Sequence, residues 1–329
     1  MNIAIVGCGL IGQKRARALA GARLVVCADT VLARAEQLAR VSNACAATDD
    51  WRKAVAREDV DAVIVATPHD SLARISGVAI AAGKHVLVEK PAARKASDLG
   101  PLISAAQASK VLVRVGLNHR YHRGFRGARE ILASGALGTL MYVRARYGHG
   151  GRVGYEKEWR AQPAISGGGE LIDQGTHVID LARWFLGNFT DISGCANTCY
   201  WDMPVDDNAF LLLKTAEGQV AFLHVSCTEW KNTFSFEIFG RKGKLQIDGL
   251  GGSYGVERLT HYKMSPQMGP PETTIWEFPM ADDSWEVEMA EFLEDICLGR
   301  QPDPGLRDAA AALEIVEEIY RKSGYDHHA

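Results

Sequence analysis

The chain has 329 residues, of which 47% are hydrophobic and 23% charged, and its formal net charge is −3. These proportions are typical of a folded protein of about two domains, and they argue against disordered, collagen-like and coiled-coil chains. The near-neutral charge argues against a nucleic-acid partner, and the lack of an 18-residue apolar run argues against a membrane-spanning helix. Seven cysteines are too sparse for a disulfide scaffold, and a strand-like start at Asn2 leaves no room for a signal peptide. We therefore expect a cytoplasmic protein.

The first third of the chain alternates apolar, β-branched segments with alanine-rich ones. Strands buried on both faces are predicted for the apolar segments Ile3–Val6, Leu24–Ala28, Asp61–Ala66, His85–Glu89 and Val111–Val115. Helices are predicted for the intervening segments Gln13–Ala20, Val31–Ala39, Ser71–Ala82 and Ser97–Ser109. This alternation predicts an α/β domain over residues 1–120, with the doubly wound parallel sheet of a Rossmann fold.

The pattern changes after residue 120, where strands follow one another with short connections. The predicted strands are Met141–Tyr147, Phe210–Lys214, Gln219–Ser226, Phe234–Phe239 and Lys244–Ile247. The predicted helices are Glu170–Phe185, Trp285–Cys297 and Leu306–Lys322. Residues 121–329 are therefore expected to form an α+β domain with a mainly antiparallel, open sheet, whose C-terminal helix can pack back on the first domain.

A glycine-rich turn directly follows the first predicted strand. Its pattern, G-x-G-x-x-G, permits a tight turn, a close approach of the backbone to a pyrophosphate, and close packing of helix on strand. The helix N-terminus adds unpaired N–H groups that bind phosphate. The candidate cofactor-binding residues of this turn are Gly7, Gly9, Leu10, Ile11 and Gly12. A simple strand-to-helix turn could use the same glycines, so the prediction of a dinucleotide site also depends on an acidic residue further along.

Asp29 is that acidic residue. It follows Gly12 by 17 residues and ends the second predicted strand, where a carboxylate accepts hydrogen bonds from the hydroxyls of the adenosine ribose. The same carboxylate repels the 2′-phosphate of NADP. The next basic residue, Arg34, comes only inside the following helix. We therefore expect NAD to be preferred over NADP.

Two further segments carry groups suited to acid–base chemistry. Lys90 follows the strand His85–Glu89 at the sheet edge where α/β proteins bind ligands, and it could donate to a substrate oxygen. It could equally be a surface lysine before a proline turn. Asp173, His177 and Asp180 have the spacing of one helical face, and a histidine beside carboxylates is a candidate general base. A charge pair on a helix surface would have the same pattern.

The chain resembles the Gfo/Idh/MocA family of oxidoreductases over essentially its whole length. The resemblance depends on the glycine turn, the Glu-Lys-Pro tripeptide at Lys90, and the pattern GGG-x3-D-x-G-x-H-x2-D that starts at Gly167. It implies a Rossmann domain followed by an α/β domain whose open sheet forms subunit contacts. It also implies that Lys90, Asp173 and His177 occupy the catalytic positions. His177 would remove the proton from a sugar-type hydroxyl, Lys90 would bind the same oxygen, and Asp173 would position the substrate or tune His177.

The same resemblance supplies further candidates for cofactor binding. They are Thr67, Pro68, Glu89, Lys90, Trp159 and Arg160. The Trp-Arg pair resembles one that lies near the cofactor in the family, and the Thr-Pro pair fits a backbone wall beside the nicotinamide ribose. The family often has Thr-Pro-Asn-x-x-His after the fourth strand. This chain has Leu72 in place of that histidine, so a polar contact from position 72 is not expected.

The substrate is less clearly indicated. The segment from Arg114 to Arg160 has ten Lys and Arg against three Glu, a local charge of +7. A basic region would suit an anionic substrate such as a nucleotide-linked sugar, a uronate or a sugar acid, but a solvated helix face would have the same composition. The candidate substrate residues, which follow the last Rossmann strand, are Asn118, His119, Arg120, Tyr121 and His122. No metal site is expected, because Cys195 and Cys199 lack a second pair at zinc spacing.

Three functions remain open from the sequence. The leading hypothesis is an NAD-dependent dehydrogenase that acts on a secondary alcohol of a sugar, a sugar derivative or a cyclitol, because a sensor would need neither Lys90 nor His177. The alternatives are a non-catalytic sensor of NAD and a sugar, and a redox-neutral enzyme that cleaves a glycoside through transient oxidation. Successive apolar residues in Phe210–Leu213 and Val220–Val225 predict a homodimer or homotetramer formed through the second sheet.

Overall fold

The computed structural model describes residues 1–325, which form two compact units. Unit 1 contains Met1–Asn118 and Trp285–Glu314, and unit 2 contains His119–Ser284 and residues 315–325. The sequence analysis placed the boundary after residue 120 and assigned the rest of the chain to the second domain. The structure instead places residues 285–314 in unit 1. Met289 and Phe292 of this segment are buried in the same apolar cluster as the first strands of the chain.

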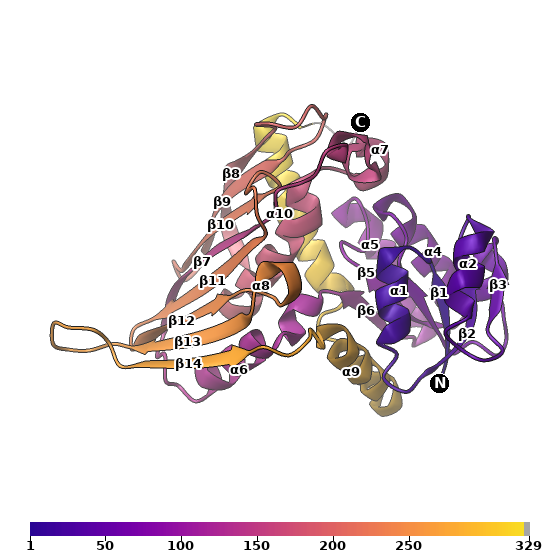
Figure 1. The fold of residues 1–329 in the computed structure, drawn as a ribbon, viewed down its shortest axis with the longest axis horizontal. Helices are drawn as coiled ribbons and strands as arrows, with labels where there is room; N and C mark the ends of the chain where they lie inside the picture. Colours follow the sequence, from indigo (N-terminus) through magenta and orange to yellow (C-terminus); the bar gives the residue numbers. More distant parts are fainter. Residues whose placement is uncertain (326–329) are drawn as a thin grey trace. The chain divides into compact units, whose positions relative to one another are not determined.

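Unit 1 is built on a six-stranded parallel sheet (Figure 1). Its strands are β1 (Asn2–Val6), β2 (Arg23–Ala28), β3 (Ala46–Thr48), β4 (Ala62–Val65), β5 (His85–Glu89) and β6 (Val113–Gly116). Their spatial order is β3-β2-β1-β4-β5-β6, the order of dinucleotide-binding folds, which confirms the predicted Rossmann sheet. The sequence analysis missed β3, because a three-residue strand with two alanines has no β-branched pattern.

The helices of unit 1 cover this sheet and bring the chain back to the sheet edge. They are α1 (Leu10–Arg17), α2 (Leu32–Ala39), α3 (Trp51–Val55), α4 (His69–Ala81), the 3₁₀ turn η1 (Ala96–Asp98), α5 (Leu99–Ser109), α9 (Ser284–Leu298) and the first part of α10 (Leu306–Ser323). Helix α1 begins earlier than the predicted start at Gln13, inside the glycine turn itself. Its free N–H groups therefore lie at the turn, where a phosphate would need them.

Arg15 of α1 is a fully buried cation between two carboxylates. Its Nε lies 2.6 Å from Oε1 of Glu89 at the end of β5, and its Nη1 lies 2.5 Å from Oε2 of Glu288 on α9. The guanidinium also stacks on Trp285, 4.4 Å from the ring centroid. Burial raises the pKa of Glu288 to about 6, although Arg15 opposes the shift. This buried cluster ties α9 to α1 and to the end of β5.

Arg15→Met should strongly destabilise the protein, because it leaves the carboxylates of Glu89 and Glu288 buried without this cation. Breaking a buried ion pair costs roughly 3–5 kcal/mol, and we expect a decrease of that size in the free energy of unfolding in denaturant at neutral pH. Arg57→Met is the matched control, since the ion pair between Arg57 and Asp59 is largely exposed and its loss should leave the midpoint nearly unchanged. Equal midpoints for the two variants would contradict the role of the buried cluster.

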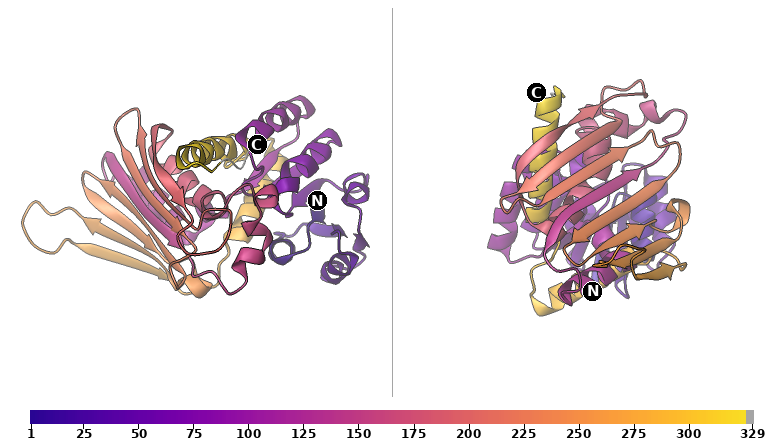
Figure 2. Two further views of the ribbon diagram at one scale, coloured as in Figure 1. Left: turned by 90° about the horizontal axis from the view of Figure 1, so that it is seen from above. Right: turned by 90° about the vertical axis from the view of Figure 1, so that its left-hand side faces the viewer.

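Unit 2 contains an eight-stranded sheet with one face left open by its helices (Figure 2). Its strands are β7 (Leu140–Gly148), β8 (Phe189–Asn197), β9 (Asn208–Thr215), β10 (Val220–Ser226), β11 (Thr233–Gly240), β12 (Gly243–Asp248), β13 (Glu257–Lys263) and β14 (Thr273–Phe278). Their order is β14-β13-β12-β11-β7-β10-β9-β8, and the pairs are antiparallel except for β7 with β10. This confirms the mainly antiparallel sheet. The edge strands β8 and β14 were not predicted, because they are mostly exposed and lack an apolar repeat; β13 was also missed.

Short helical segments surround the covered face of this sheet. They are η2 (Asn118–Tyr121), α6 (Arg123–Ala133), η3 (Tyr155–Lys157), η4 (Trp159–Ala161), α7 (Pro163–Ser166), the π turn η5 (Leu171–Gly175), α8 (Thr176–Leu186), η6 (Gly252–Tyr254) and the last part of α10. Phe125 of α6 and Phe185 of α8 both pack on Phe236 of β11, which fixes α8 on the sheet. None of the helices described in residues 1–325 is both long and apolar enough to cross a bilayer.

Candidate active site

The glycine turn of unit 1 joins β1 to α1, and two of its glycines leave no room for a side chain. Gly7 has a φ of +94°, and a Cβ there would lie 2.4 Å from the carbonyl oxygen of Ala66, next to β4. A Cβ on Gly12 would lie 2.0 Å from the carbonyl oxygen of Gly7. A Cβ on Gly9 would meet nothing within 4 Å, so the backbone there faces open space that a pyrophosphate can approach. The three positions therefore fit the tight turn, the phosphate approach and the helix packing that a dinucleotide requires.

The Asp29 carboxylate is fixed beside this turn by two backbone N–H groups. Its Oδ2 accepts a hydrogen bond from the N–H of Cys8 (2.8 Å), and its Oδ1 accepts one from the N–H of Val31 (2.9 Å). Each oxygen of an ionised carboxylate can accept more than one hydrogen bond. Asp29 therefore keeps acceptor capacity for the ribose hydroxyls that the sequence analysis assigned to it.

The ends of β4 and β5 carry the other candidates of unit 1. Thr67 and Pro68 follow β4 and begin α4, where the hydroxyl of Ser71 donates to Oγ1 of Thr67 (2.9 Å). Lys90 follows β5 and is half-buried. The Glu89 carboxylate binds the buried Arg15, so the structure gives it a part in holding the end of β5. The contact of Glu89 with the cofactor stays a prediction.

The imidazole of His177 is enclosed by other rings of unit 2. His177 lies in the first turn of α8 and is only 5% exposed. The His119 ring stacks on it with centroids 3.8 Å apart and planes 25° apart, and the Tyr147 ring lies 6.3 Å away, edge on. This packing fixes the orientation of the imidazole, as a general base requires.

Asp173, four residues before His177, is held by Arg160. The Nε of Arg160 lies 2.7 Å from Oδ2 of Asp173, and the guanidinium stacks on Trp159 at 4.6 Å from a ring centroid. The charge of Asp173 raises the pKa of Arg160. Arg160 thus binds Asp173, a candidate catalytic residue of the same unit. The contact of Trp159 and Arg160 with the cofactor stays a prediction.

Asp173, His177 and Asp180 were expected on one face of a regular helix, and the structure corrects this. Asp173 lies in the π turn η5, whose hydrogen bonds span one residue more than those of an α-helix. Asp180 lies on α8 and binds the buried guanidinium of Arg120 through two hydrogen bonds, of 2.6 and 2.8 Å. The two carboxylates are therefore bound by different arginines.

The five candidate substrate residues from Asn118 to His122 are all buried, and their contacts distinguish them. Arg120 binds Asp180, and the Nδ1 of His122 lies 3.3 Å from Oε2 of Glu257, so both belong to buried polar pairs. His119 stacks directly on His177. The structure therefore places His119 at the candidate base.

Two of the three glycines from Gly167 to Gly169 lie where a side chain would collide with its neighbours. A Cβ on Gly169 would lie 1.9 Å from the carbonyl oxygen of Asp206, and one on Gly168 would lie 2.3 Å from the hydroxyl of Tyr320. The Asp206 carboxylate accepts hydrogen bonds from the N–H of Gly169 (2.8 Å), the N–H of Leu171 (2.7 Å) and the hydroxyl of Tyr320 (2.6 Å). This buried anchor fixes the start of η5 and hence the position of Asp173.

Several polar residues near Asp173 were missed by the sequence analysis. The Nε2 of His149 lies 3.3 Å from Oε1 of the buried Glu170. Burial alone would lower the pKa of His149. The hydrogen bond to Glu170 and the charge of Glu170 outweigh burial, so the pKa of His149 is raised overall. Tyr254 packs on Tyr147 with centroids 5.5 Å apart, and burial raises the pKa of Tyr254 to about 12. Glu170 follows the triple glycine, which was the one available signal. The tyrosines lie in segments without a motif.

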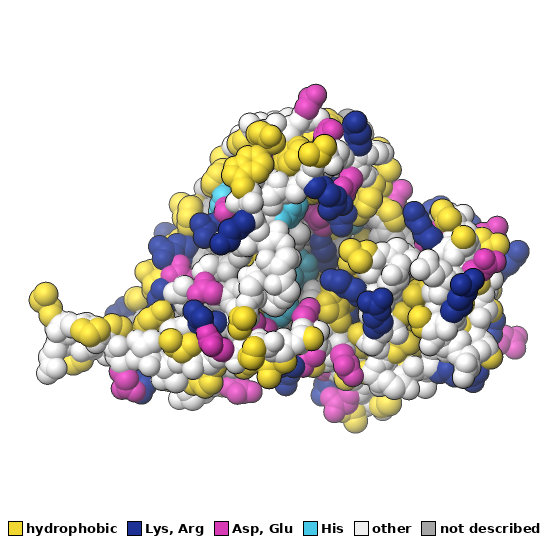
Figure 3. Space-filling model, in the orientation of Figure 1, with side chains coloured by type: hydrophobic (Ala, Val, Ile, Leu, Met, Phe, Trp, Pro, Cys, Tyr) yellow, Lys and Arg dark blue, Asp and Glu magenta, His cyan; other side chains and the backbone are white. Residues whose placement is uncertain are grey.

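The basic segment from Arg114 to Arg160 is largely neutralised in the folded chain. Six of its ten cations form ion pairs, and five of the six bind an acid from outside the segment. The six pairs are Arg114 with Asp295, Arg120 with Asp180, Arg123 with Asp283, Arg144 with Glu237, Arg152 with Glu158, and Arg160 with Asp173. On the face drawn in Figure 3, cationic and anionic side chains are likewise interspersed.

Unit 1 has the sheet order, the glycine turn and the strand-end carboxylate of a dinucleotide-binding domain. Unit 2 adds a buried histidine and a carboxylate on one short stretch of chain, both held by packed neighbours. Within residues 1–325, no group of three or more His, Cys, Asp and Glu residues could hold a metal ion. These features define the class of two-domain, dinucleotide-dependent oxidoreductases.

Comparison with known families is consistent with this class. Residues 1–117 match the family model described as an oxidoreductase family with an NAD-binding Rossmann fold, and residues 125–246 match the C-terminal domain of the GFO/IDH/MocA proteins. The chain therefore belongs to the Gfo/Idh/MocA family of oxidoreductases, and its first domain is an NAD-binding Rossmann domain. Both the family and the NAD cofactor that the sequence indicated are confirmed.

Known relatives cover much of the chain at low identity. A levoglucosan dehydrogenase of Pseudarthrobacter phenanthrenivorans is 25% identical over 283 residues, which are 74% of this chain and 73% of the relative. An inositol 2-dehydrogenase of Rhizobium meliloti is 25% identical over 98% of this chain and 96% of the relative. A solved structure of levoglucosan dehydrogenase with NADH and levoglucosan has the same fold, with a TM-score of 0.87, 24% identity and 98% of each chain covered.

Proposed function

We propose that the protein is an NAD-dependent dehydrogenase that oxidises a secondary alcohol of a neutral sugar or cyclitol. The observation that carries this proposal is the enclosed imidazole of His177, which lies in one motif with Asp173 and is packed against His119. A binding protein without turnover has no need of an oriented base. The relatives named for levoglucosan and inositol both act on uncharged polyhydroxylated rings, which supports the same class of substrate for this chain.

In the proposed reaction, one residue removes a proton and another stabilises negative charge. His177 would accept the proton of the substrate hydroxyl as general base, and Lys90 would donate a hydrogen bond to the same oxygen and stabilise its developing negative charge. Asp173, held by Arg160, would orient the substrate or His177. NAD⁺, bound by the glycine turn and Asp29, would supply the acceptor for the hydride that leaves the carbinol carbon.

The paired arginines favour a neutral substrate over an anionic one. An anion would need cations with unfilled pairing capacity, whereas Arg120, Arg123 and Arg160 each bind a carboxylate. The nucleotide-linked sugars, uronates and sugar acids that the basic segment suggested are the alternative substrates that the test must include. A panel of neutral polyols, aldoses and their anionic derivatives, followed with NAD⁺ at the nicotinamide absorbance, tests the proposal. NADH formation with a neutral member supports it, and activity confined to anionic members would contradict it.

Asp29→Ser should reduce the preference for NAD over NADP. In the wild type, the carboxylate beside the N–H of Cys8 repels a 2′-phosphate, so NAD should bind with the lower Kd. Removing the charge should raise the Kd of NAD and lower that of NADP relative to it, as measured by titration of both cofactors. Asp70→Ser changes an exposed acidic residue of α4, is the control, and should leave the ratio unchanged. An unchanged ratio in Asp29→Ser would remove Asp29 from cofactor selection.

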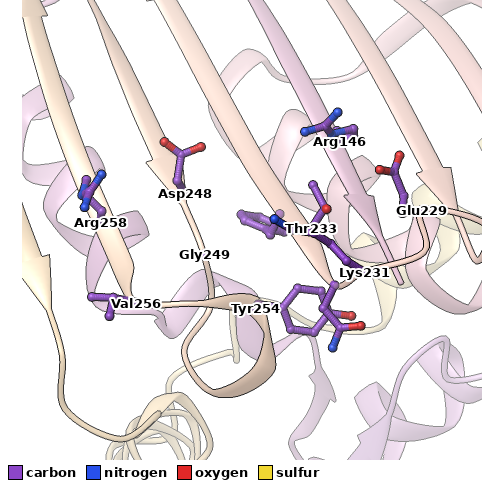
Figure 4. A pocket seen from close by; sticks show the side chains of 11 residues that line it. Arg146, Glu229, Lys231, Thr233, Asp248, Gly249, Tyr254, Val256 and Arg258 are labelled. Atoms are coloured by element: carbon purple, nitrogen blue, oxygen red, sulfur yellow. The ribbon is translucent and has the colours of Figure 1, made fainter. Parts of the chain in front are cut away.

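We further propose that the open face of the second sheet binds a second copy of the chain. Strand pairing places Leu212 opposite Phe222, and Phe210 stacks on His224 with ring centroids 4.4 Å apart. Phe210, Leu212 and Phe222 are 39%, 51% and 46% exposed and form a contiguous apolar strip on the adjacent strands β9 and β10. Arg146, Lys231 and Asp248 surround a neighbouring hollow of about 620 Å³ (Figure 4). An apolar centre with a charged rim is the composition of a protein interface.

Phe222→Glu should dissociate the oligomer, because it places a charge in the middle of the apolar strip. Light scattering should give a dimer or tetramer for the wild type and a smaller species for the variant. Met268→Glu, in a fully exposed loop away from the strip, is the control and should keep the wild-type mass. A wild-type protein that is monomeric at all practical concentrations would contradict the proposed interface.

The two alternative functions make different predictions for the same assay. A sensor would bind NAD and a sugar without forming NADH, and a redox-neutral glycosidase would release a sugar without net NADH. Product analysis of each reaction in the panel separates them.

Location in the cytoplasm also stays a prediction. The seven cysteines, all of which are free, are consistent with a reducing compartment.

A further inference from the structure

Three cysteines of unit 1 converge directly beneath the dinucleotide turn. Cys8 lies between Gly7 and Gly9, Cys27 lies near the end of β2, and Cys45 immediately precedes β3. The Sγ atoms of Cys27 and Cys45 are 3.7 Å apart, and the thiol of Cys8 donates a hydrogen bond to the carbonyl oxygen of Ala28, the residue after Cys27 (3.4 Å). Cys8 and Cys27 are fully buried, whereas Cys45 is partly exposed.

We propose that Cys27 and Cys45 form a peroxide-sensitive dithiol, and that its oxidation to a disulfide weakens the binding of NAD. Two thiols in contact, one of them reachable from solvent, have the arrangement of a redox-active pair with an attacking and a resolving cysteine. The inference depends on NAD binding by unit 1 and is independent of the substrate.

The surroundings of the two sulfurs assign their roles. The hydrogen bond from Cys27 lowers the pKa of Cys45, and the charge of Arg57 acts in the same direction against burial. Hydrogen bonding to Cys45 and Cys8, together with burial, raises the pKa of Cys27. Cys45 is therefore the partly exposed thiol that ionises more readily and that a peroxide can reach, and Cys27 is the buried thiol behind it.

The oxidation proceeds in two balanced steps. The Cys45 thiolate attacks one oxygen of hydrogen peroxide, breaks the O–O bond, and becomes a sulfenic acid while hydroxide leaves. The Cys27 sulfur then attacks the Cys45 sulfur, forms the S–S bond and expels the sulfenic oxygen as water, with the thiol proton neutralising the charge. In total, two thiols and one peroxide give one disulfide and two waters, and the two sulfurs are oxidised as the two peroxide oxygens are reduced.

The disulfide is expected to disturb Asp29, because the strand that carries Cys27 also carries the binding carboxylate. An S–S bond is about 2.05 Å long, so the two sulfurs must approach each other well within their 3.7 Å separation. Cys27 is two residues before Asp29, and the Asp29 carboxylate accepts the N–H of Cys8 in the glycine turn. A movement of β2 therefore changes the position of the group that holds the adenosine ribose. By linkage, NAD should in turn oppose oxidation.

The test treats the reduced protein with a small excess of hydrogen peroxide, maps disulfides by peptide mass spectrometry and measures the Kd of NAD⁺ before and after. We expect a Cys27–Cys45 crosslinked peptide, a rise in Kd of at least about fivefold, the low end of typical coupling, and recovery after dithiothreitol. Saturating NAD⁺ during the treatment should lower the yield of the crosslink.

Variants separate this pair from the other cysteines. Cys45→Ser should abolish both the crosslink and the change in Kd, and Cys27→Ser should leave Cys45 as a sulfenic acid trapped by dimedone. Cys297→Ser removes an exposed cysteine on α9 and should behave as the wild type. The reduced variants must first bind NAD⁺ with the wild-type Kd, which shows that they are folded. A crosslink at any other pair, no crosslink, or a Cys27–Cys45 disulfide with unchanged Kd would overturn the proposal.

Discussion

His177→Ala should lower kcat by about 10²–10⁴, the usual effect of losing a positioned general base, while the Kd of NAD⁺ stays near that of the wild type. The reason is that the predicted dinucleotide contacts lie in the glycine turn and at Asp29 of unit 1, whereas His177 lies on α8 of unit 2. Steady-state kinetics on the best substrate of the panel, together with NAD⁺ titration, measure both quantities.

The pH dependence gives a second readout for the same residue. Oxidation in the wild type should slow at low pH, because a protonated imidazole cannot accept the hydroxyl proton, and this limb should vanish in His177→Ala. His261→Ala is the matched control, since His261 is a similarly buried histidine of unit 2 on β13, and it should keep a near-normal kcat. A normal kcat in His177→Ala would move the base to another group, with Asp173 the first candidate.

Lys90→Ala should lower kcat by about 10²–10³, the effect of removing one donor that stabilises a developing oxyanion, and should raise the KM for the alcohol. Lys90→Arg keeps the charge but changes the geometry, so it should recover only part of the rate. Lys53→Ala changes an exposed lysine of α3, is the control, and should leave both parameters unchanged.

The effects of Lys90→Ala and His177→Ala should not add in the double variant, because the proposed mechanism has both residues act on one oxygen in one transition state. A double variant whose loss equals the product of the single losses would indicate that the two side chains act on different steps. Lys90→Ala with an unchanged kcat would leave Lys90 as a surface residue before the turn at Pro91.

The parallel sheet was predictable from sequence because its strands are buried on both faces and read as continuous apolar runs. In Ile3–Val6 and Asp61–Ala66 the apolar run is long enough to be found by composition alone. The strands that sequence reasoning missed lack this signal. β3 is too short, and β8 and β14 are edge strands with mostly exposed side chains. The assignment of α9 to unit 1 depends on the tertiary packing of Phe292, which no local pattern encodes.

The candidate site was predictable where chemistry is concentrated in a motif. The glycine turn, Lys90, Asp173 and His177 were all found as patterns of residue type and spacing. The partners that hold them were not. Arg160 precedes Asp173 by 13 residues, and Asp206 lies far beyond the turn that it fixes. The ion pairs of the basic segment were not predictable for the same reason, because most of the acids that bind its arginines come from other parts of the chain.

The most direct test of the proposed activity follows the hydrogen of the carbinol carbon. The substrate identified in the panel is labelled with deuterium at the carbon that is oxidised, and the reaction with NAD⁺ is analysed by mass spectrometry of both products. We predict one deuterium in the reduced nicotinamide, a deuterium-free ketone, and one NADH formed per ketone. Deuterium retained in or returned to the sugar product without net NADH would contradict dehydrogenation and support the redox-neutral alternative.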